Sequence, residues 1–240
     1  MVYTNTEVNV KEEKVKILEE MMKAGCQYGR AKRYTHPSMK PYLIRNKKGN
    51  IEFFNLEKTL MELDKVANFM KEIIKENKII LFVGAKPAAE DSIEKIAKEF
   101  NMPYLNYKWV GGFITNFQTI QNRIAYFKEL LQKEQSGEIE NYPPKDKQRL
   151  LRDLDKMKKI YSGVINLERL PDVIFIIDLA YKSHKTALNE ALKKNIPVIA
   201  IAGSDNDISN VKYFVPVNDK APSSIRFIIN YLIQKIKENG

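Results

Sequence analysis

Three short stretches of the chain are apolar at almost every position. They are KIILFVG (78–84), DVIFIID (172–178) and PVIAIAG (197–203). A continuous apolar run of this length predicts a strand that is buried on both faces, as in a parallel sheet. Shorter strands are predicted at IEFFN (51–55), PYLNYKW (103–109) and YFVPV (213–217).

Between these runs, apolar residues recur at the spacing of one helix face. Gly25 follows the first such stretch directly and predicts its C-terminal end, because glycine readily adopts the left-handed conformation. Strand and helix then alternate, which predicts an α/β fold with a mostly parallel sheet and helices on both faces. The predicted helices are 11–24, 56–74, 87–100, 185–194 and 223–237.

The alternation stops between residues 116 and 162, where two long polar helices each carry a single apolar stripe. The turn-forming stretch SGEIENYPPKD (136–146) separates them. We therefore predict an inserted helical hairpin, or coiled-coil arm, that buries one stripe against the other. The expected division is an α/β domain of residues 1–115 and 163–240, and a hairpin of residues 116–162.

Positive charge is concentrated in one part of the chain. The net charge is +10, and residues 21–50 hold eight Lys or Arg and no Asp or Glu. An ordinary solvated loop mixes both signs, so an acid-free segment favours contact with a polyanion. Pro37, Pro41 and Gly49 predict that this segment lacks regular structure, and its self-repulsion predicts that it settles only on its partner.

No apolar run approaches the roughly 18 residues that span a membrane. The N-terminus lacks a signal-peptide pattern, and Cys26 is the only cysteine, so no internal disulfide can form. These features predict a protein of the cytosol or of an organelle matrix.

The sequence offers weak candidates for chemistry. VGAKPAAE (83–90) is too short between Gly84 and Lys86 for a nucleotide-binding P-loop. Asp178, Asp205 and Asp207 follow strands, where carboxylates can bind Mg²⁺ or transfer protons, but acids there are commonly caps or turn formers. Cys26 and His36 lack two further ligands for zinc.

Trp109, the only tryptophan, lies in KWVGGFITNF (108–117) beside a glycine pair. It either packs beneath a turn or contacts a partner, and both roles are compatible. In residues 21–50, which we call the basic segment, cations alternate with Tyr and His rings. Lys and Arg neutralise phosphates, and rings stack on unpaired bases, so folded RNA is the favoured partner.

Several motifs in one order resemble the family of the bacterial-type small-ribosomal-subunit protein S-two, over residues 15 to 235. They are AGCQYGR (24–30), HPSMKPY (36–42), FVGAK (82–86), KWVGG (108–112) followed by Thr115 and Asn116, LPD (170–172), PVND (216–219) and SIR (224–226). Gln27 and Arg30 stand where the family has a histidine pair.

The resemblance implies a non-enzymatic structural protein of the small ribosomal subunit, with no catalytic residue, metal or cofactor. It implies binding to small-subunit rRNA, late assembly, docking of the large mRNA-binding subunit protein, and a cytoplasmic or organellar ribosome. Neighbouring ribosomal proteins are the other expected partners, without a membrane or a homo-oligomer. The predicted RNA-binding residues are Gln27, Tyr28, Arg30, Lys32, Arg33, Tyr34, His36, Lys40, Tyr42, Arg45, Lys47, Lys48, Lys86, Lys108, Trp109, Asn116 and Arg123.

Two alternatives remain at this point. One is a doubly wound enzyme or sensor that binds a phosphorylated small molecule near Gly84, Asp178 and Gly203. The other is an arm-mediated protein scaffold that does not bind RNA. The first leaves the acid-free segment and the arm unexplained, and the second leaves the acid-free segment unexplained.

Overall fold

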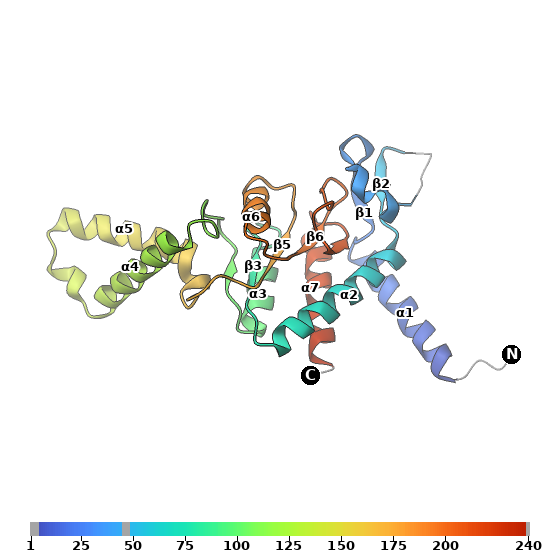
Figure 1. The fold of residues 1–240 in the computed structure, drawn as a ribbon, viewed down its shortest axis with the longest axis horizontal. Helices are drawn as coiled ribbons and strands as arrows, with labels where there is room; N and C mark the ends of the chain where they lie inside the picture. The colour runs from blue at the N-terminus through green and yellow to red at the C-terminus, as the bar shows by residue number, and fades with distance from the viewer. Residues whose placement is uncertain (1–4, 45–48, 239–240) are drawn as a thin grey trace. The chain divides into compact units, whose positions relative to one another are not determined.

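A computed structural model describes the backbone of residues 5–44 and 49–238, and side chains from residue 12 onward within those ranges. Its strands form a five-stranded parallel sheet in the order β4-β3-β5-β6-β7, and a separate pair of β1 and β2. Helices flank the sheet (Figure 1), which confirms the predicted α/β fold class. No helix in these ranges is long and apolar enough to cross a membrane.

The chain groups into two compact units, which are described separately. Unit 1 comprises Met1–Glu76, Ile177–Ala180 and Ile199–Gly240, and unit 2 comprises Asn77–Ile176 and Tyr181–Val198. The domain division expected from the sequence follows other boundaries and stays a prediction.

Unit 1 surrounds the parallel strands β6 and β7, which pair from Ile199 with Tyr213 to Ala202 with Pro216. Helix α2 buries an apolar stripe that includes Leu60, Leu63 and Met70. The elements of this unit are α1 (Asn5–Lys23), β1 (Tyr28–Ala31), η1 (Lys32–Tyr34), η2 (Pro37–Tyr42), β2 (Ile51–Phe53), α2 (Leu56–Lys75), β6 (Val198–Ala202), β7 (Tyr213–Pro216) and α7 (Pro222–Lys237).

Helix α1 ends at Lys23, and Gly25 forms its C-terminal cap as the sequence predicts. Gly25 has a φ of 77°, in the left-handed region. The Cys26 N–H donates to the Met21 carbonyl at 3.0 Å, and the Gly25 N–H donates to the Met22 carbonyl at 3.0 Å. These two bonds form a Schellman cap, which fixes the direction in which the chain leaves the helix.

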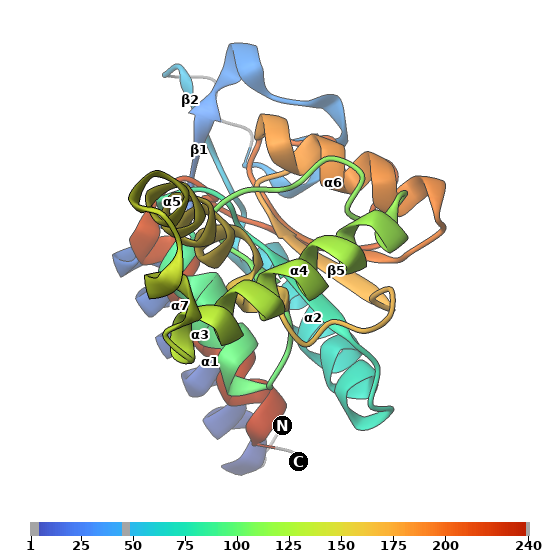
Figure 2. The ribbon, with the colours of Figure 1, turned by 90° about the vertical axis from the view of Figure 1, so that its left-hand side faces the viewer.

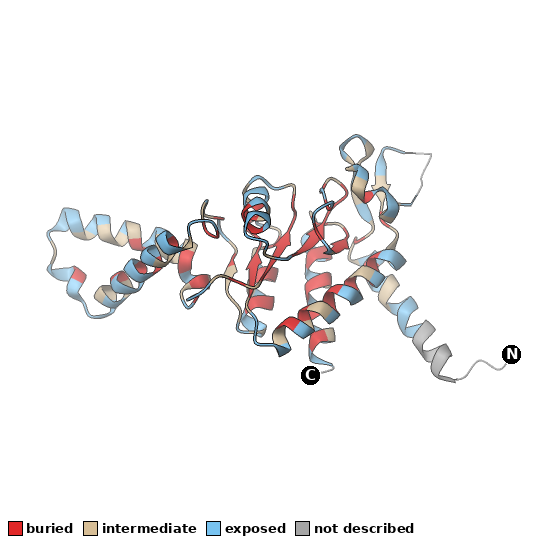
Figure 3. Ribbon diagram, viewed as in Figure 1, coloured by how far each residue is buried: buried red, intermediate tan, exposed pale blue. Residues whose placement is uncertain are grey.

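Unit 2 contains β3, β4 and β5, which run parallel with β3 in the middle. All four residues of β3 and all five of β5 are buried (Figure 3), as their apolar runs predict. The elements are β3 (Ile80–Val83), α3 (Glu90–Glu99), β4 (Tyr104–Leu105), α4 (Phe117–Gln135), η3 (Glu138–Asn141), α5 (Pro144–Tyr161), η4 (Ser162–Val164), β5 (Val173–Ile177) and α6 (Lys182–Lys193).

Helices α4 and α5 lie side by side in unit 2 (Figures 1 and 2). The Phe127 and Tyr161 rings pack 6.4 Å apart between centroids, and Lys158 Nζ bonds to Glu134 Oε2 at 2.7 Å. One face of each helix is buried and the rest is exposed. That this helix pair works as a coiled-coil arm stays a prediction.

Candidate nucleic-acid interface

The basic segment has regular structure through much of its length. Strand β1 pairs antiparallel with β2, and two 3-10 helices follow it. The prediction that Pro37 and Pro41 exclude regular structure was therefore wrong. Pro37 occupies the first turn of η2, where its missing N–H costs nothing and its fixed φ favours a helical turn.

Hydrogen bonds to distant parts of unit 1 hold this segment in place. The Phe54 N–H donates to the Gln27 carbonyl at 2.8 Å, and the His36 N–H donates to the Ser204 carbonyl at 2.8 Å. The Arg30 N–H donates to Ser204 Oγ at 2.8 Å. Met39 of η2 is fully buried and anchors the segment in the core. The segment thus presents its cations from a fixed backbone.

Two arginines and a tyrosine form a stacked group on this segment. The Arg30 guanidinium carbon lies 5.0 Å from the centroid of the Tyr34 ring, and the Arg33 guanidinium carbon lies 4.7 Å from it. Such cation–π contacts fix the orientation of the planar guanidinium groups. Tyr34 is still 49% exposed, as is Tyr28. We name Tyr28, Arg30, Lys32, Arg33, Tyr34 and Lys40 the basic surface.

Strand-end acids of unit 1 converge on one lysine that sequence reasoning missed. Lys220 Nζ lies 2.7 Å from Asp178 Oδ2, 3.2 Å from Asp219 Oδ2 and 3.7 Å from Asp205 Oδ2. Arg30 adds a second cation, 2.8 Å from Asp205. Burial lowers the pKa of Lys220, but the nearby carboxylates of Asp219 and Asp178 raise it more, so the net shift is upward.

The fully buried Asn206 completes this charge cluster of Asp178, Asp205, Asp219 and Lys220. Its side-chain nitrogen donates to Asp205 Oδ1 at 3.1 Å and to Asp219 Oδ2 at 3.2 Å. Its oxygen accepts the Leu179 N–H. Because each acid of the cluster has a partner within the chain, the cluster ties together the loops that follow β5, β6 and β7.

Asp207, in contrast, is a turn former. Its Oδ1 accepts the Ser209 hydroxyl at 2.7 Å and the Ser209 N–H at 2.9 Å, and these bonds lower the pKa of Asp207. Cys26 is fully buried, and burial raises the pKa of its thiol to about 11. The thiol is therefore protonated at neutral pH. No cluster of three or more potential metal ligands occurs among the described residues.

The predicted RNA-binding residues occupy both units. In unit 1, Tyr28, Arg30, Arg33, Tyr34 and Lys40 are exposed, whereas Gln27, Lys32, His36 and Tyr42 are partly buried. Arg45, Lys47 and Lys48 lie outside the described residues. In unit 2, Lys108, Asn116 and Arg123 are exposed, Lys86 is partly buried and Trp109 is buried.

Trp109 is buried, which confirms that it packs beneath a turn, whereas its role in contacting RNA stays a prediction. The side chain is 3% exposed, and its Nε1 donates to Glu190 Oε1 at 3.1 Å. Glu190, itself 6% exposed, also accepts the N–H groups of Gly112 at 2.8 Å and Ile114 at 2.9 Å. Trp109 thus holds the loop that leads into α4 in place, as expected of a tryptophan that packs beneath a turn.

Glu190 was not among the functional residues predicted from the sequence, although its position on α6 is informative. It lies on the buried face of α6 together with His184, Ala187 and Ala191. A charged residue on an otherwise apolar helix face indicates a buried partner. The partner here is a set of backbone N–H groups, which the sequence pattern does not reveal.

The turn after β3 has the tight geometry expected of a strand-to-helix connection. A side chain at Gly84 would place its Cβ 2.3 Å from Ile93 Cγ1, so only glycine fits without movement. The Ala85 N–H donates to Nε2 of the fully buried His184 at 2.9 Å. His184 Nε2 is therefore an acceptor, and this imidazole supports the turn.

Comparison with known proteins agrees with these observations. The family described as ribosomal protein S2 matches residues 21–239. The small ribosomal subunit protein uS2 of Coprothermobacter proteolyticus is 38% identical over 221 residues, which cover 92% of this chain and 81% of that protein. The proteins of the same description from Dictyoglomus thermophilum and Thermus thermophilus are 37% and 36% identical, over 92% and 91% of this chain and 89% and 84% of those proteins. The chain therefore belongs to the ribosomal protein S2 family and is a structural protein of the small ribosomal subunit, acting in translation.

Proposed function

We propose that the chain binds small-subunit rRNA through the basic surface. The observation that carries this proposal is the exposure of cations and rings together on a backbone held by hydrogen bonds. Arg33 and Lys40 are exposed and have no ion pair with a described residue. Exposed Tyr28 and Tyr34 supply rings for unpaired bases.

The proposal also includes a role in subunit assembly. A protein with a preformed cationic surface can join RNA helices that have already folded, which suits late entry into the subunit. We also propose, from the family resemblance alone, that the chain helps to dock the large mRNA-binding protein of the subunit where that protein is present. The expected location is the ribosome of the cytoplasm or of an organelle.

Removing two cations tests the RNA contact. We expect Arg33→Ala combined with Lys40→Ala to weaken binding to small-subunit rRNA about tenfold or more at ~0.1 M salt, because each lost phosphate contact forfeits counterion release. The slope of log affinity against log salt should become shallower by about two. Filter binding or fluorescence anisotropy over a salt series measures both quantities.

A matched control removes equal charge elsewhere in unit 1. Lys71 and Lys75 lie towards the C-terminal end of α2, and neither belongs to the basic surface. Lys71→Ala combined with Lys75→Ala should leave the affinity and the salt slope close to those of the unmodified chain. Equal losses in the two double variants would show that net charge, and not the basic surface, determines binding.

A further inference from the structure

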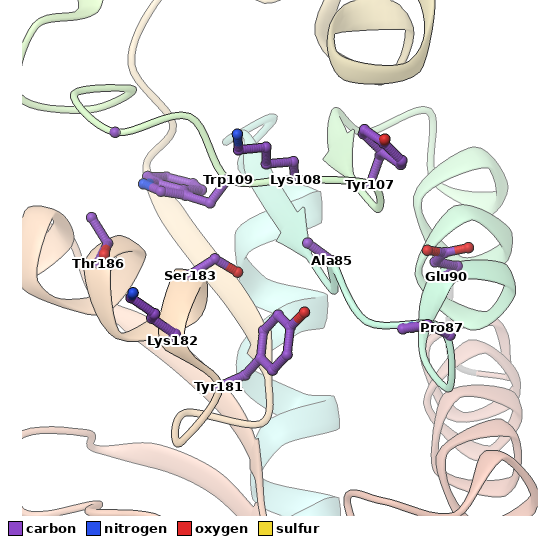
Figure 4. Close-up of a pocket in the computed structure, with 11 residues that line it drawn as sticks. Ala85, Pro87, Glu90, Tyr107, Lys108, Trp109, Tyr181, Lys182, Ser183 and Thr186 are labelled. Atoms are coloured by element: carbon purple, nitrogen blue, oxygen red, sulfur yellow. The ribbon is translucent and has the colours of Figure 1, made fainter. Parts of the chain in front are cut away.

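Unit 2 contains a hollow that the proposed role of the basic surface does not use. Its volume is about 690 Å³, which falls in the range of ligand-binding sites in proteins. It lies where the chain leaves β3 and β4 and where α6 begins, and Figure 4 shows Ala85 between its walls. In open α/β sheets, ligands bind at this carboxyl edge, beside the strand where the order reverses.

Two exposed tyrosines line the hollow. Tyr107 is 53% exposed and Tyr181 is 41% exposed, which is high for large rings in a concave site. The Tyr181 ring meets the buried His184 ring edge to face, with centroids 5.0 Å apart. One side of Tyr181 is therefore fixed by packing while the other remains available as a stacking platform.

The first turn of α6 supplies the features of an anion site. Helix α6 has no acid in its first turn, so its dipole is not neutralised there. Lys182 is exposed on this turn and has no ion pair with a described residue. Ser183 Oγ is buried and lacks a hydrogen-bond partner among the described residues, although it lines the hollow. Rotation of the Ser183 side chain towards the hollow would let a bound phosphate oxygen supply that missing partner.

The far wall of the hollow has the opposite character. The Glu90 carboxylate lies across from α6 in Figure 4, on the same side as Pro87. A carboxylate suits the amino group or ring N–H on the edge of a base, and it repels phosphate. The hollow thus has an anion-binding end at α6, an aromatic platform and a hydrogen-bond acceptor, in that order.

We propose that this hollow binds one unpaired nucleotide, with its phosphate at the first turn of α6 and its base against Tyr181. The buried Trp109, held by Glu190, forms a rigid part of the wall. The ligand is either a nucleotide of RNA or a free mononucleotide. The first source rests on the proposed function, whereas the chemistry of the site is the same for both.

The first arm of the test uses the purified full chain and AMP in equilibrium dialysis. We expect saturable binding that Tyr181→Leu weakens about tenfold, since stacking of a base on a ring has this order of effect. Tyr181→Phe should bind as the unmodified chain does. Ribose 5-phosphate, which keeps the phosphate but lacks the base, should bind about tenfold more weakly than AMP.

Matched variants control for loss of a ring and of a charge. Tyr126 is 47% exposed on α4 and lies outside the hollow, and Lys185 lies on α6 outside it. Tyr126→Leu and Lys185→Ala should leave binding unchanged, whereas Lys182→Ala should weaken it severalfold. Thermal melting identifies any variant that is unfolded. Tyr181→Phe keeps the ring and removes only the hydroxyl, so its binding shows whether the ring itself is required.

The second arm uses a single-stranded RNA hexamer that carries 4-thiouridine, with cross-links mapped by mass spectrometry. Cross-links on residues 107–109 or 181–186 support RNA as the source, and AMP binding without them supports a free nucleotide. The proposal is overturned if neither ligand reaches the hollow, or if Tyr181→Leu and Tyr126→Leu bind alike. The Arg33→Ala and Lys40→Ala variant reports separately on the basic surface, so the two proposals can fail independently.

Discussion

Replacing Glu190 by leucine is expected to lower the free energy of unfolding by roughly 3–5 kcal/mol. The carboxylate accepts five hydrogen bonds, from Trp109 Nε1, the N–H groups of Gly112, Ile114 and Thr115, and the Thr115 hydroxyl. Leucine fits the apolar face of α6 but leaves these donors without an acceptor, and each buried unpaired donor costs about 1–3 kcal/mol. Glu190→Gln should cost less, because one amide oxygen remains.

Trp109 is a local reporter for this prediction, because the chain has one tryptophan. Chemical denaturation followed by tryptophan fluorescence gives the free energy, and a red-shifted emission in the folded variant would show that water reaches the ring. Glu129→Gln is the matched control, since Glu129 is exposed on α4 and its one ion pair among the described residues is with Lys133. The control should change stability by less than about 0.5 kcal/mol. Similar effects of Glu129→Gln and Glu190→Gln would contradict the assigned role of Glu190.

Lys220→Met is expected to destabilise unit 1 by about 3–5 kcal/mol at neutral pH. Breaking a buried ion pair by removing one partner leaves uncompensated charge, which is costly. Here the acids that lose their cation include Asp178 and Asp219, whose side chains are 3% and 1% exposed. Lys220→Arg keeps the charge and should cost less. Thermal melting of unmodified and variant chains at pH 7 measures the difference.

The pH dependence of the stability difference between Lys220→Met and the unmodified chain distinguishes loss of charge from loss of packing. The deficit of Lys220→Met should shrink as the pH rises through the folded pKa of Lys220, because the unmodified chain then loses the ammonium charge that the variant lacks. In the unmodified chain the pKa of Lys220 is raised, so its contribution is complete below the unfolded pKa of about 10.4 and is lost as the pH rises through the folded pKa.

Lys212→Met is the control for the loss of one positive charge. Lys212 is exposed, and its main contact is a cation–π contact with Tyr213, in which the ammonium lies 5.3 Å from the ring centroid. This variant should melt within a few degrees of the unmodified chain at all pH values. A deficit of Lys220→Met that stays constant with pH would indicate lost packing and not the lost charge of Lys220.

The sequence predicted those parts of the fold that depend on local pattern. Strands β3, β5 and β6 lie within the apolar runs, because a strand buried on both faces leaves a signature that needs no knowledge of its partners. The cap that Gly25 forms on helix α1 was also predicted, because it too depends on local sequence. Strand β4 is shorter than predicted, since the chain turns after Leu105 into the loop that Glu190 holds.

What the sequence did not predict depends on distant partners. Strand β1 reads YGRA and has no apolar alternation, so only its pairing with β2 makes it a strand. Lys220 and Asp178 are separated by 42 residues, and Glu190 and Trp109 by 81. The sequence predicted the exposed cations as a group. Their fixed arrangement depends on Met39, Ser204 and Asp205, which are not basic residues and so were not part of that prediction.

The position of Arg30 has a kinetic consequence. One of its terminal nitrogens is held by Asp205, yet 45% of its side chain is exposed. A guanidinium that already contacts Asp205 and the Tyr34 ring loses less side-chain entropy when an anion reaches its open edge. Encounter with a ribosomal partner would then resemble the docking of two rigid bodies, and long-range attraction would govern its rate more than any rearrangement of the chain.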